Sequence, residues 1–95
     1  MNLKAETTLS CMVSLGMFST ERGVVVALPG GRTVSALVDR RSVLVDQEPT
    51  PGSEVPGRVR VFVVSSEDDS VVLELPQAGF TQGPRLKVPK ALLKK

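Results

Sequence analysis

Two hairpin patterns on either side of a proline- and glycine-rich connection constrain this chain more than any other feature of its sequence. Each pattern consists of two valine-rich runs around a short turn, and the four runs are residues 24–28, 33–38, 58–64 and 71–75. Such β-branched runs around a tight turn are typical of antiparallel hairpins. A further apolar run at residues 9–18 predicts a strand before the first hairpin. The sequence therefore predicts an all-β fold of five strands.

The length of the chain limits how these strands can be arranged. With 95 residues, of which 41% are hydrophobic, the chain is predicted to form one globular domain with a valine-rich core. Closure into a small barrel would remove exposed strand edges. We expect an N-terminal arm (1–8), a barrel (9–75) and a basic C-terminal extension (76–95). An OB-type and an SH3-like barrel both fit this pattern.

The connection and the fourth strand give more local predictions. Residues 39–57 hold three prolines, so a short strand or one helical turn fits there and a long helix does not. In the fourth strand, side chains alternate between the two faces of the sheet. The valines are expected to face the core and the alternate residues the solvent: Val59, Val61 and Val63 against Arg58, Arg60 and Phe62.

The chemistry that the chain lacks excludes several classes of function. There is no histidine, and the only cysteine is Cys11, so a Ser–His or Cys–His nucleophile pair and a zinc site of the usual type are both excluded. We therefore expect no enzyme activity, no catalytic residue, no metal and no cofactor. A lone cysteine forms no internal disulfide, and no signal-peptide pattern or membrane-spanning apolar run is seen, which predicts a soluble cytoplasmic protein without a membrane partner.

Basic residues supply the main functional hint. The extension 76–95 carries five lysines and arginines and no acidic residue. Phosphate groups are usually contacted by such side chains, and arginine also stacks on bases. The candidate nucleic-acid-binding residues are Arg22, Arg32, Arg40, Arg41, Arg58, Arg60, Phe62, Arg85, Lys87 and Lys90. Among them, Arg40 and Arg41 beside Arg22 and Arg32 form the predicted central patch, provided that adjoining strands bring them together.

Four segments of the chain resemble an S1-type RNA-binding domain: residues 22–28, 35–39, 51–61 and 69–75. They match the second, third, fourth and fifth strands of that family in order. The resemblance implies a five-stranded barrel of the OB class that associates with RNA or a ribonucleoprotein. Where RNA-binding members of the family carry two aromatics and a histidine, this chain has Arg22, Val25 and Asp39, so it resembles a degenerate member.

Two other functions also fit the sequence. Apolar residues of the extension, namely Leu86, Val88, Leu92 and Leu93, would suit a protein–protein adaptor that docks on a partner or on a second copy of the chain. Residues 30–36 look somewhat like part of a TOBE-type barrel, which would imply the binding of a small anion.

Overall fold

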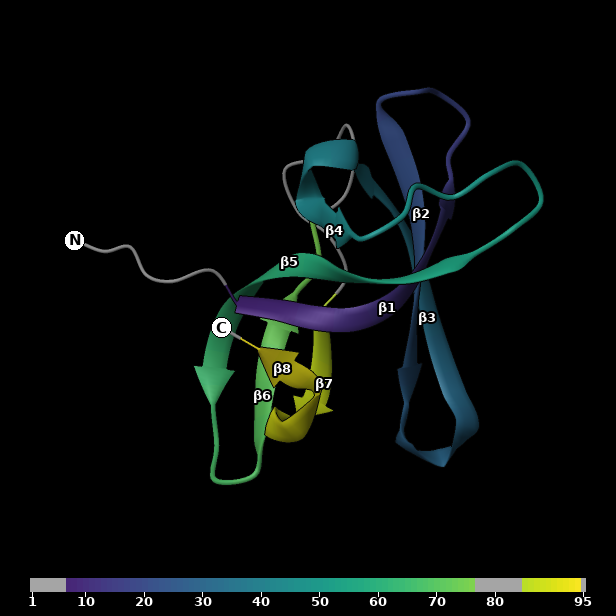
Figure 1. Cartoon of the computed structure of the whole chain (residues 1–95). Helices are drawn as coiled ribbons and strands as arrows, with labels where there is room; N and C mark the ends of the chain where they lie inside the picture. Colours follow the sequence, from purple (N-terminus) through teal and green to yellow (C-terminus); the bar gives the residue numbers. More distant parts are fainter. Residues whose placement is uncertain (1–6, 77–84, 95) are drawn as a thin grey trace.

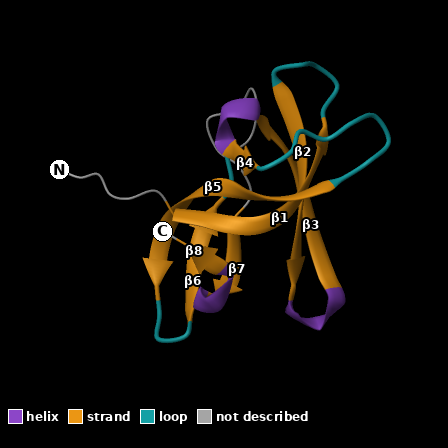
Figure 2. Ribbon diagram, in the orientation of Figure 1, coloured by secondary structure: helices purple, strands orange, loops and turns teal. Residues whose placement is uncertain are grey.

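The computed structural model describes residues 7–76 and 85–94, and in these ranges the chain is built from β-strands and short 3₁₀ turns (Figures 1 and 2). The strands are β1 (Thr7–Leu15), β2 (Glu21–Leu28), β3 (Arg32–Asp39), β4 (Val43–Val45), β5 (Val55–Ser66), β6 (Ser70–Glu74), β7 (Arg85–Pro89) and β8 (Leu93–Lys94). The turns are η1 (Pro29–Gly31), η2 (Arg40–Ser42) and η3 (Lys90–Leu92). The predicted all-β fold is confirmed.

All strand pairs are antiparallel and belong to one curled sheet. Its main order is β3-β2-β1-β5-β6-β7, while β4 also pairs with β5 and β8 also pairs with β1. The curled sheet forms a half-barrel, which agrees with the predicted small barrel. The described residues contain eight strands where the sequence predicted five. The three additional strands are β4, β7 and β8.

The two halves of the chain repeat one arrangement of elements. Apart from the turn η1 between β2 and β3, the order β1, β2, β3, η2 and β4 recurs as β5, β6, β7, η3 and β8. The turns η2 and η3 begin fifty positions apart, at Arg40 and Lys90. Equivalent backbone bonds hold them, since Arg40 N–H donates to the Thr20 carbonyl (2.8 Å) and Lys90 N–H to the Asp69 carbonyl (2.9 Å). We refer to residues 7–45 as the N-terminal half and to 55–94 as the C-terminal half.

Each half completes the sheet of the other. The last strand of the N-terminal half, β4, pairs with β5, the first strand of the C-terminal half. In the same way, β8 pairs with β1. Strands β1 and β5 also pair with each other along Thr7–Val13 and Val55–Val61. They are therefore the centre of the sheet, and neither half has all its strand partners within itself.

The core is formed by aliphatic side chains from both halves. The buried cluster consists of Leu9, Cys11, Val13, Val24, Val26, Val38, Val59, Val61, Val71, Leu73, Leu75, Leu86 and Val88. Val59 and Val61 face this core as the alternation predicts. Val63 is 46% exposed instead. A register shift between Val63 and Ser65 interrupts the β5–β6 ladder at this point, so the simple alternation of faces ends there.

The segments that the sequence left less defined are part of the same sheet. In the connection 39–57, the short strand and the helical turn that were alternatives are both present, as η2 followed by β4. Residues 85–94, which the sequence analysis placed in the basic extension, pair with β6 through β7 and with β1 through β8. Within the described ranges, the structure has no helix of the length and apolar character that crossing a membrane requires.

Candidate nucleic-acid interface

Arginines from three elements meet at one end of the sheet. Glu21, at the start of β2, is paired with Asp39 at the end of β3, so Arg22 lies near η2 with its Arg40 and Arg41. Arg60 reaches the same place from β5, because its Nη1 donates to the Arg41 carbonyl. We call this group, Arg22, Arg40, Arg41 and Arg60, the arginine end. Of the predicted central patch, the structure thus places Arg22 beside the turn that carries Arg40 and Arg41.

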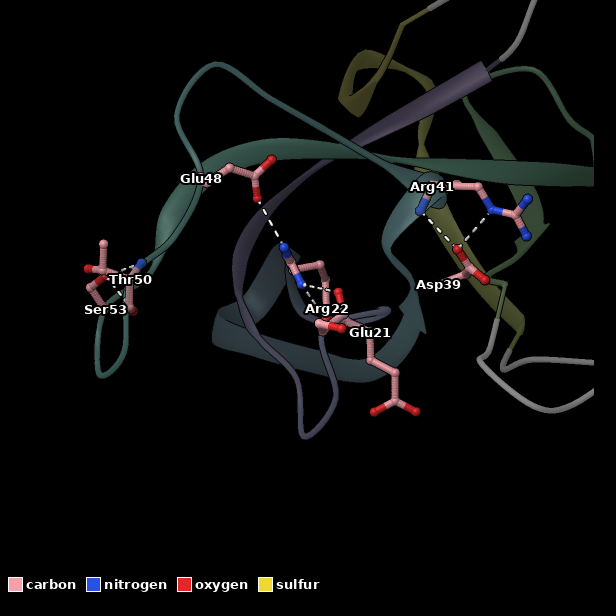
Figure 3. A network of polar contacts seen from close by, with 8 residues as sticks. Glu21, Arg22, Asp39, Arg41, Glu48, Thr50 and Ser53 are labelled. Atoms are coloured by element: carbon pink, nitrogen blue, oxygen red, sulfur yellow. Dashed lines mark hydrogen bonds and ion pairs between the residues drawn. The ribbon is translucent and has the colours of Figure 1, made fainter.

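A hollow lies at the arginine end. Its lining residues come from the β1–β2 loop, from β3, η2 and β4, and from the segment after β4: Ser19, Thr20, Asp39, Arg40, Arg41, Val43 and Glu48. Ser19 and Glu48 accept hydrogen bonds from the guanidinium of Arg22, and Figure 3 shows the contact between Arg22 and Glu48. The hollow therefore has exposed arginines at its rim and a buried arginine behind it.

Arg22 is buried because of its place in the strand alternation. It lies on the same face of β2 as Val24 and Val26, and it is only 6% exposed. Its Nη1 donates to the carbonyls of Ser19 (3.1 Å) and Glu21 (2.7 Å), and its Nη2 to Glu48 Oε1 (3.2 Å). Its Nε is buried without an acceptor among the described residues. The guanidinium thus has hydrogen-bonding capacity that this part of the chain does not use.

Asp39 fixes the backbone of η2 beside this guanidinium. Its Oδ1 accepts hydrogen bonds from the backbone N–H of Arg41 (2.9 Å) and from Arg41 Nε (3.2 Å). These bonds hold the pKa of the Asp39 carboxyl below its ordinary value, so it stays ionised at neutral pH. The Arg41 side chain is 91% exposed and the Asp39 side chain 45%, so their ion pair is a surface pair. The carboxylate orders the turn and leaves most of Arg41 in solvent.

Sequence reasoning missed the role of Glu48 in this site and the loop position of Phe18 next to it. Phe18 was placed in the first strand, but it lies in the β1–β2 loop and is 65% exposed, directly before Ser19 of the hollow. Sequence reasoning assigned Glu48 no role beyond that of one of several acidic residues that balance the arginines, because a single acidic residue in a proline-rich connection has no distinguishing pattern. The signal for Phe18 was Gly16, which precedes it and ends the alternation of β1.

Other predicted site residues lie away from the arginine end or are engaged within the sheet. Arg32 is paired with Leu28 at the opposite end of the β2–β3 hairpin, beside η1, so it is not part of the patch with Arg22. Arg58 donates from Nε to Thr8 Oγ1 (2.7 Å), from Nη1 to Ser10 Oγ (2.8 Å) and from Nη2 to the Leu92 carbonyl (3.4 Å). It therefore connects β5 with β1 and η3.

The predicted site residues of β7 and η3, namely Arg85, Lys87 and Lys90, lie apart from the arginine end. Arg85 pairs with Glu74 (3.4 Å) and Lys87 with Glu67 (3.1 Å). Lys90 begins η3, which lies on the other side of the molecule from η2 in Figure 1. Phe62, which is 62% exposed, is on β5 opposite Glu74 of β6.

Cys11 is expected to be unreactive in the folded protein. Burial raises the pKa of its thiol to about 11, although the nearby charge of Arg58 acts in the opposite direction. The reactive thiolate is therefore scarce in the folded protein at pH 8. Iodoacetamide at pH 8 should leave Cys11 unmodified in the native protein and alkylate it in urea, as read by mass spectrometry. Equal rates in both conditions would contradict this burial.

The same shift gives a direction for the effect of pH on stability. A thiol with a raised pKa retains its proton in the folded state at a pH where the unfolded chain releases it. This contribution to stability is complete below the ordinary thiol pKa of 9.0, which applies to the unfolded chain, and is lost as the pH rises toward about 11.

The chain was compared with known protein families, with curated proteins and with solved structures, and none of the three comparisons gives a match.

Proposed function

We propose that this protein is a non-enzymatic module that binds single-stranded RNA, alone or within a ribonucleoprotein, through the arginine end. The observation that carries this proposal is the hollow lined by Arg40 and Arg41, with the buried Arg22 bonded to two of its lining residues and the Arg60 side chain bonded to the Arg41 carbonyl. The exposed Phe18 directly precedes Ser19 of this hollow in the chain. Arginines that follow a phosphate backbone, together with an aromatic ring on which a base stacks, are the usual means of binding single strands.

The sequence resemblance supports the same proposal. In S1-type domains of the OB class, the second and third strands carry the residues that contact RNA, and the matching segments here contain Arg22 and end at Asp39. This chain would bind in a modified way, with guanidinium groups and Phe18 in place of the family's two aromatics and histidine. The proposed mechanism is electrostatic attraction of phosphates, followed by stacking of one base on Phe18.

The charges around the site set its expected affinity. Asp39 and Glu48 offset part of the positive charge, so few phosphates are neutralised and binding is expected to be moderate. Each neutralised phosphate releases counterions, so the affinity must fall as salt rises. Arg40 and Arg41 are the residues to change first, since both are exposed and neither is in the core.

The test is fluorescence anisotropy with a labelled single-stranded RNA of mixed sequence at two salt concentrations. The double variant Arg40→Ala/Arg41→Ala should weaken binding by about tenfold at low salt and reduce its salt dependence. Arg32→Ala is the control for position: it removes one positive charge, against two in the double variant, from the far end of the hairpin and should have little effect. Deleting the basic C-terminal segment is unsuitable, since β7 and β8 are paired strands.

Two outcomes would contradict the proposal: absence of binding at low salt, or binding that salt does not weaken. Absence of binding would favour the adaptor function instead. For that function, Leu86 and Val88 are not available, because the core buries them. The surface that favours it is a second, largely apolar hollow across β1, β2, β4 and β5, lined in part by Met12, Ala27 and Leu44.

A further inference from the structure

The repeat provides an internal comparison for the buried arginine. Arg22 of β2 is paired with Val38 of β3, and in the C-terminal half the equivalent strand β6 has Val71 paired with Val88 of β7. Both positions are buried, with Arg22 6% and Val71 4% exposed. The same place in the same arrangement thus accepts a valine. The fold itself does not require an arginine at position 22.

A buried arginine at such a position is costly. Removing a guanidinium from water is unfavourable, and a hydrophobic residue at a buried ion-pair position is often equally stable or more stable. Arg22 also leaves its Nε without an acceptor among the described residues. A side chain with this cost and with unused hydrogen-bonding capacity indicates a role other than stability.

The only carboxylate that contacts Arg22 in the described part of the chain is on an exposed segment. Glu48 belongs to the segment between the two halves, residues 46–54, and its side chain is 58% exposed, against 7% for Arg22. One oxygen of this carboxylate meets one nitrogen of the guanidinium, at 3.2 Å. A planar guanidinium accommodates two parallel bonds to a carboxylate or phosphate. Glu48 therefore makes one of the two parallel bonds that the guanidinium can form, and it does so from the solvent-exposed side.

From these observations we propose that Arg22 is a phosphate-binding residue and that Glu48 occupies its place until a phosphate displaces it. This inference rests on the proposed function, because the phosphate would be that of the RNA backbone. Ser19 and Thr20, which line the same hollow, offer hydroxyl groups to the other phosphate oxygens. When a phosphate displaces Glu48, the negative charge of Glu48 also leaves the hollow. Only an anion that binds Arg22 more strongly than Glu48 does can displace it, so Glu48 acts as a gate.

Glu48→Gln, Arg22→Met and the double variant test the gate with the same labelled RNA. Glu48→Gln should bind RNA about two- to fivefold more tightly, because the competing charge is gone. Arg22→Met should bind roughly tenfold more weakly and should abolish the gain from Glu48→Gln. Glu54→Gln removes one charge from the same connection and is the matched control. Urea unfolding must show that each variant is folded.

A second measurement does not depend on RNA. The Arg22 Nε–H resonance of the Glu48→Gln variant is followed by NMR while inorganic phosphate is added, and it should shift with saturation. A resonance that moves with phosphate while RNA does not bind would uphold the phosphate site and refute the RNA function. Salt-sensitive RNA binding with an unmoved resonance would uphold the function and overturn the gate. An equal gain from Glu48→Gln with and without Arg22 would also overturn the gate, since it would reflect general charge alone.

Discussion

Replacing Leu9 with alanine is expected to lower the free energy of unfolding by about 2–5 kcal/mol. Leu9 is fully buried, and its backbone lies between Val59 of β5 and Leu93 of β8. The cavity left by alanine would remove packing where β1 meets both β5 and β8. Small domains are stable by only roughly 5–15 kcal/mol, so this is a large fraction of the total.

Urea unfolding followed by circular dichroism measures this effect. The matched control is Leu37→Ala, which removes the same atoms from a β3 position that is 41% exposed, and it should change the free energy of unfolding by less than about 1 kcal/mol. Similar losses in the two variants would show that Leu9 is not a central core residue.

Replacing Gly57 with alanine should destabilise the protein by about 1–3 kcal/mol. Gly57 lies on β5 between Cys11 of β1 and Val45 of β4, where three strands are closely packed. An added Cβ would lie 2.8 Å from the Leu44 carbonyl oxygen and 2.7 Å from Val45 Cγ1. The Leu44 carbonyl is part of the β4 backbone and cannot rotate away as a side-chain tip can. The β4 strand would therefore have to move away from β5.

The matched control for this variant is Gly23→Ala on β2. Within 4 Å, its added Cβ would meet only the Ser14 Oγ, at 2.8 Å, and that hydroxyl can rotate away. Its expected effect is therefore small, within about 1 kcal/mol of the parent protein. Both variants are compared by their urea midpoints, and a Gly57→Ala protein as stable as Gly23→Ala would show that β4 does not press on β5.

Much of the fold could be read from the sequence because alternation and turn residues are local signals. The runs of valine predicted β2, β3, β5 and β6, and Val59 and Val61 face the core as expected. The repeat could not be read, because equivalent positions share burial and pairing but differ in residue type, as Arg22 and Val71 do. Which strands exchange between the halves depends on long-range pairing that short patterns do not encode.

The candidate site was predictable in part, for physical reasons that differ from residue to residue. Arg40 and Arg41 follow a strand end, so a surface position could be expected. Arg22 lies on the same face of β2 as Val24 and Val26, which indicates burial. Its charge pointed to an exposed position instead. Arg32 is at the far end because an antiparallel hairpin separates residues beside its turn from those at its open end. The contact of Glu48 with Arg22 joins residues 26 positions apart and has no local signal.

The last strand of each half pairs with the first strand of the other half. The strand pairs of the sheet therefore do not depend on which half comes first along the chain. Thr8 lies opposite Lys94, so the two ends of the described chain are neighbours. The connection at 46–54 is exposed except for Pro49. A circular permutant opened in this connection, with its original ends joined, would begin with β5 and end with β4 while keeping every strand pair. The architecture is in this sense a closed loop of two interlocked units, for which the position of the chain break is a secondary matter.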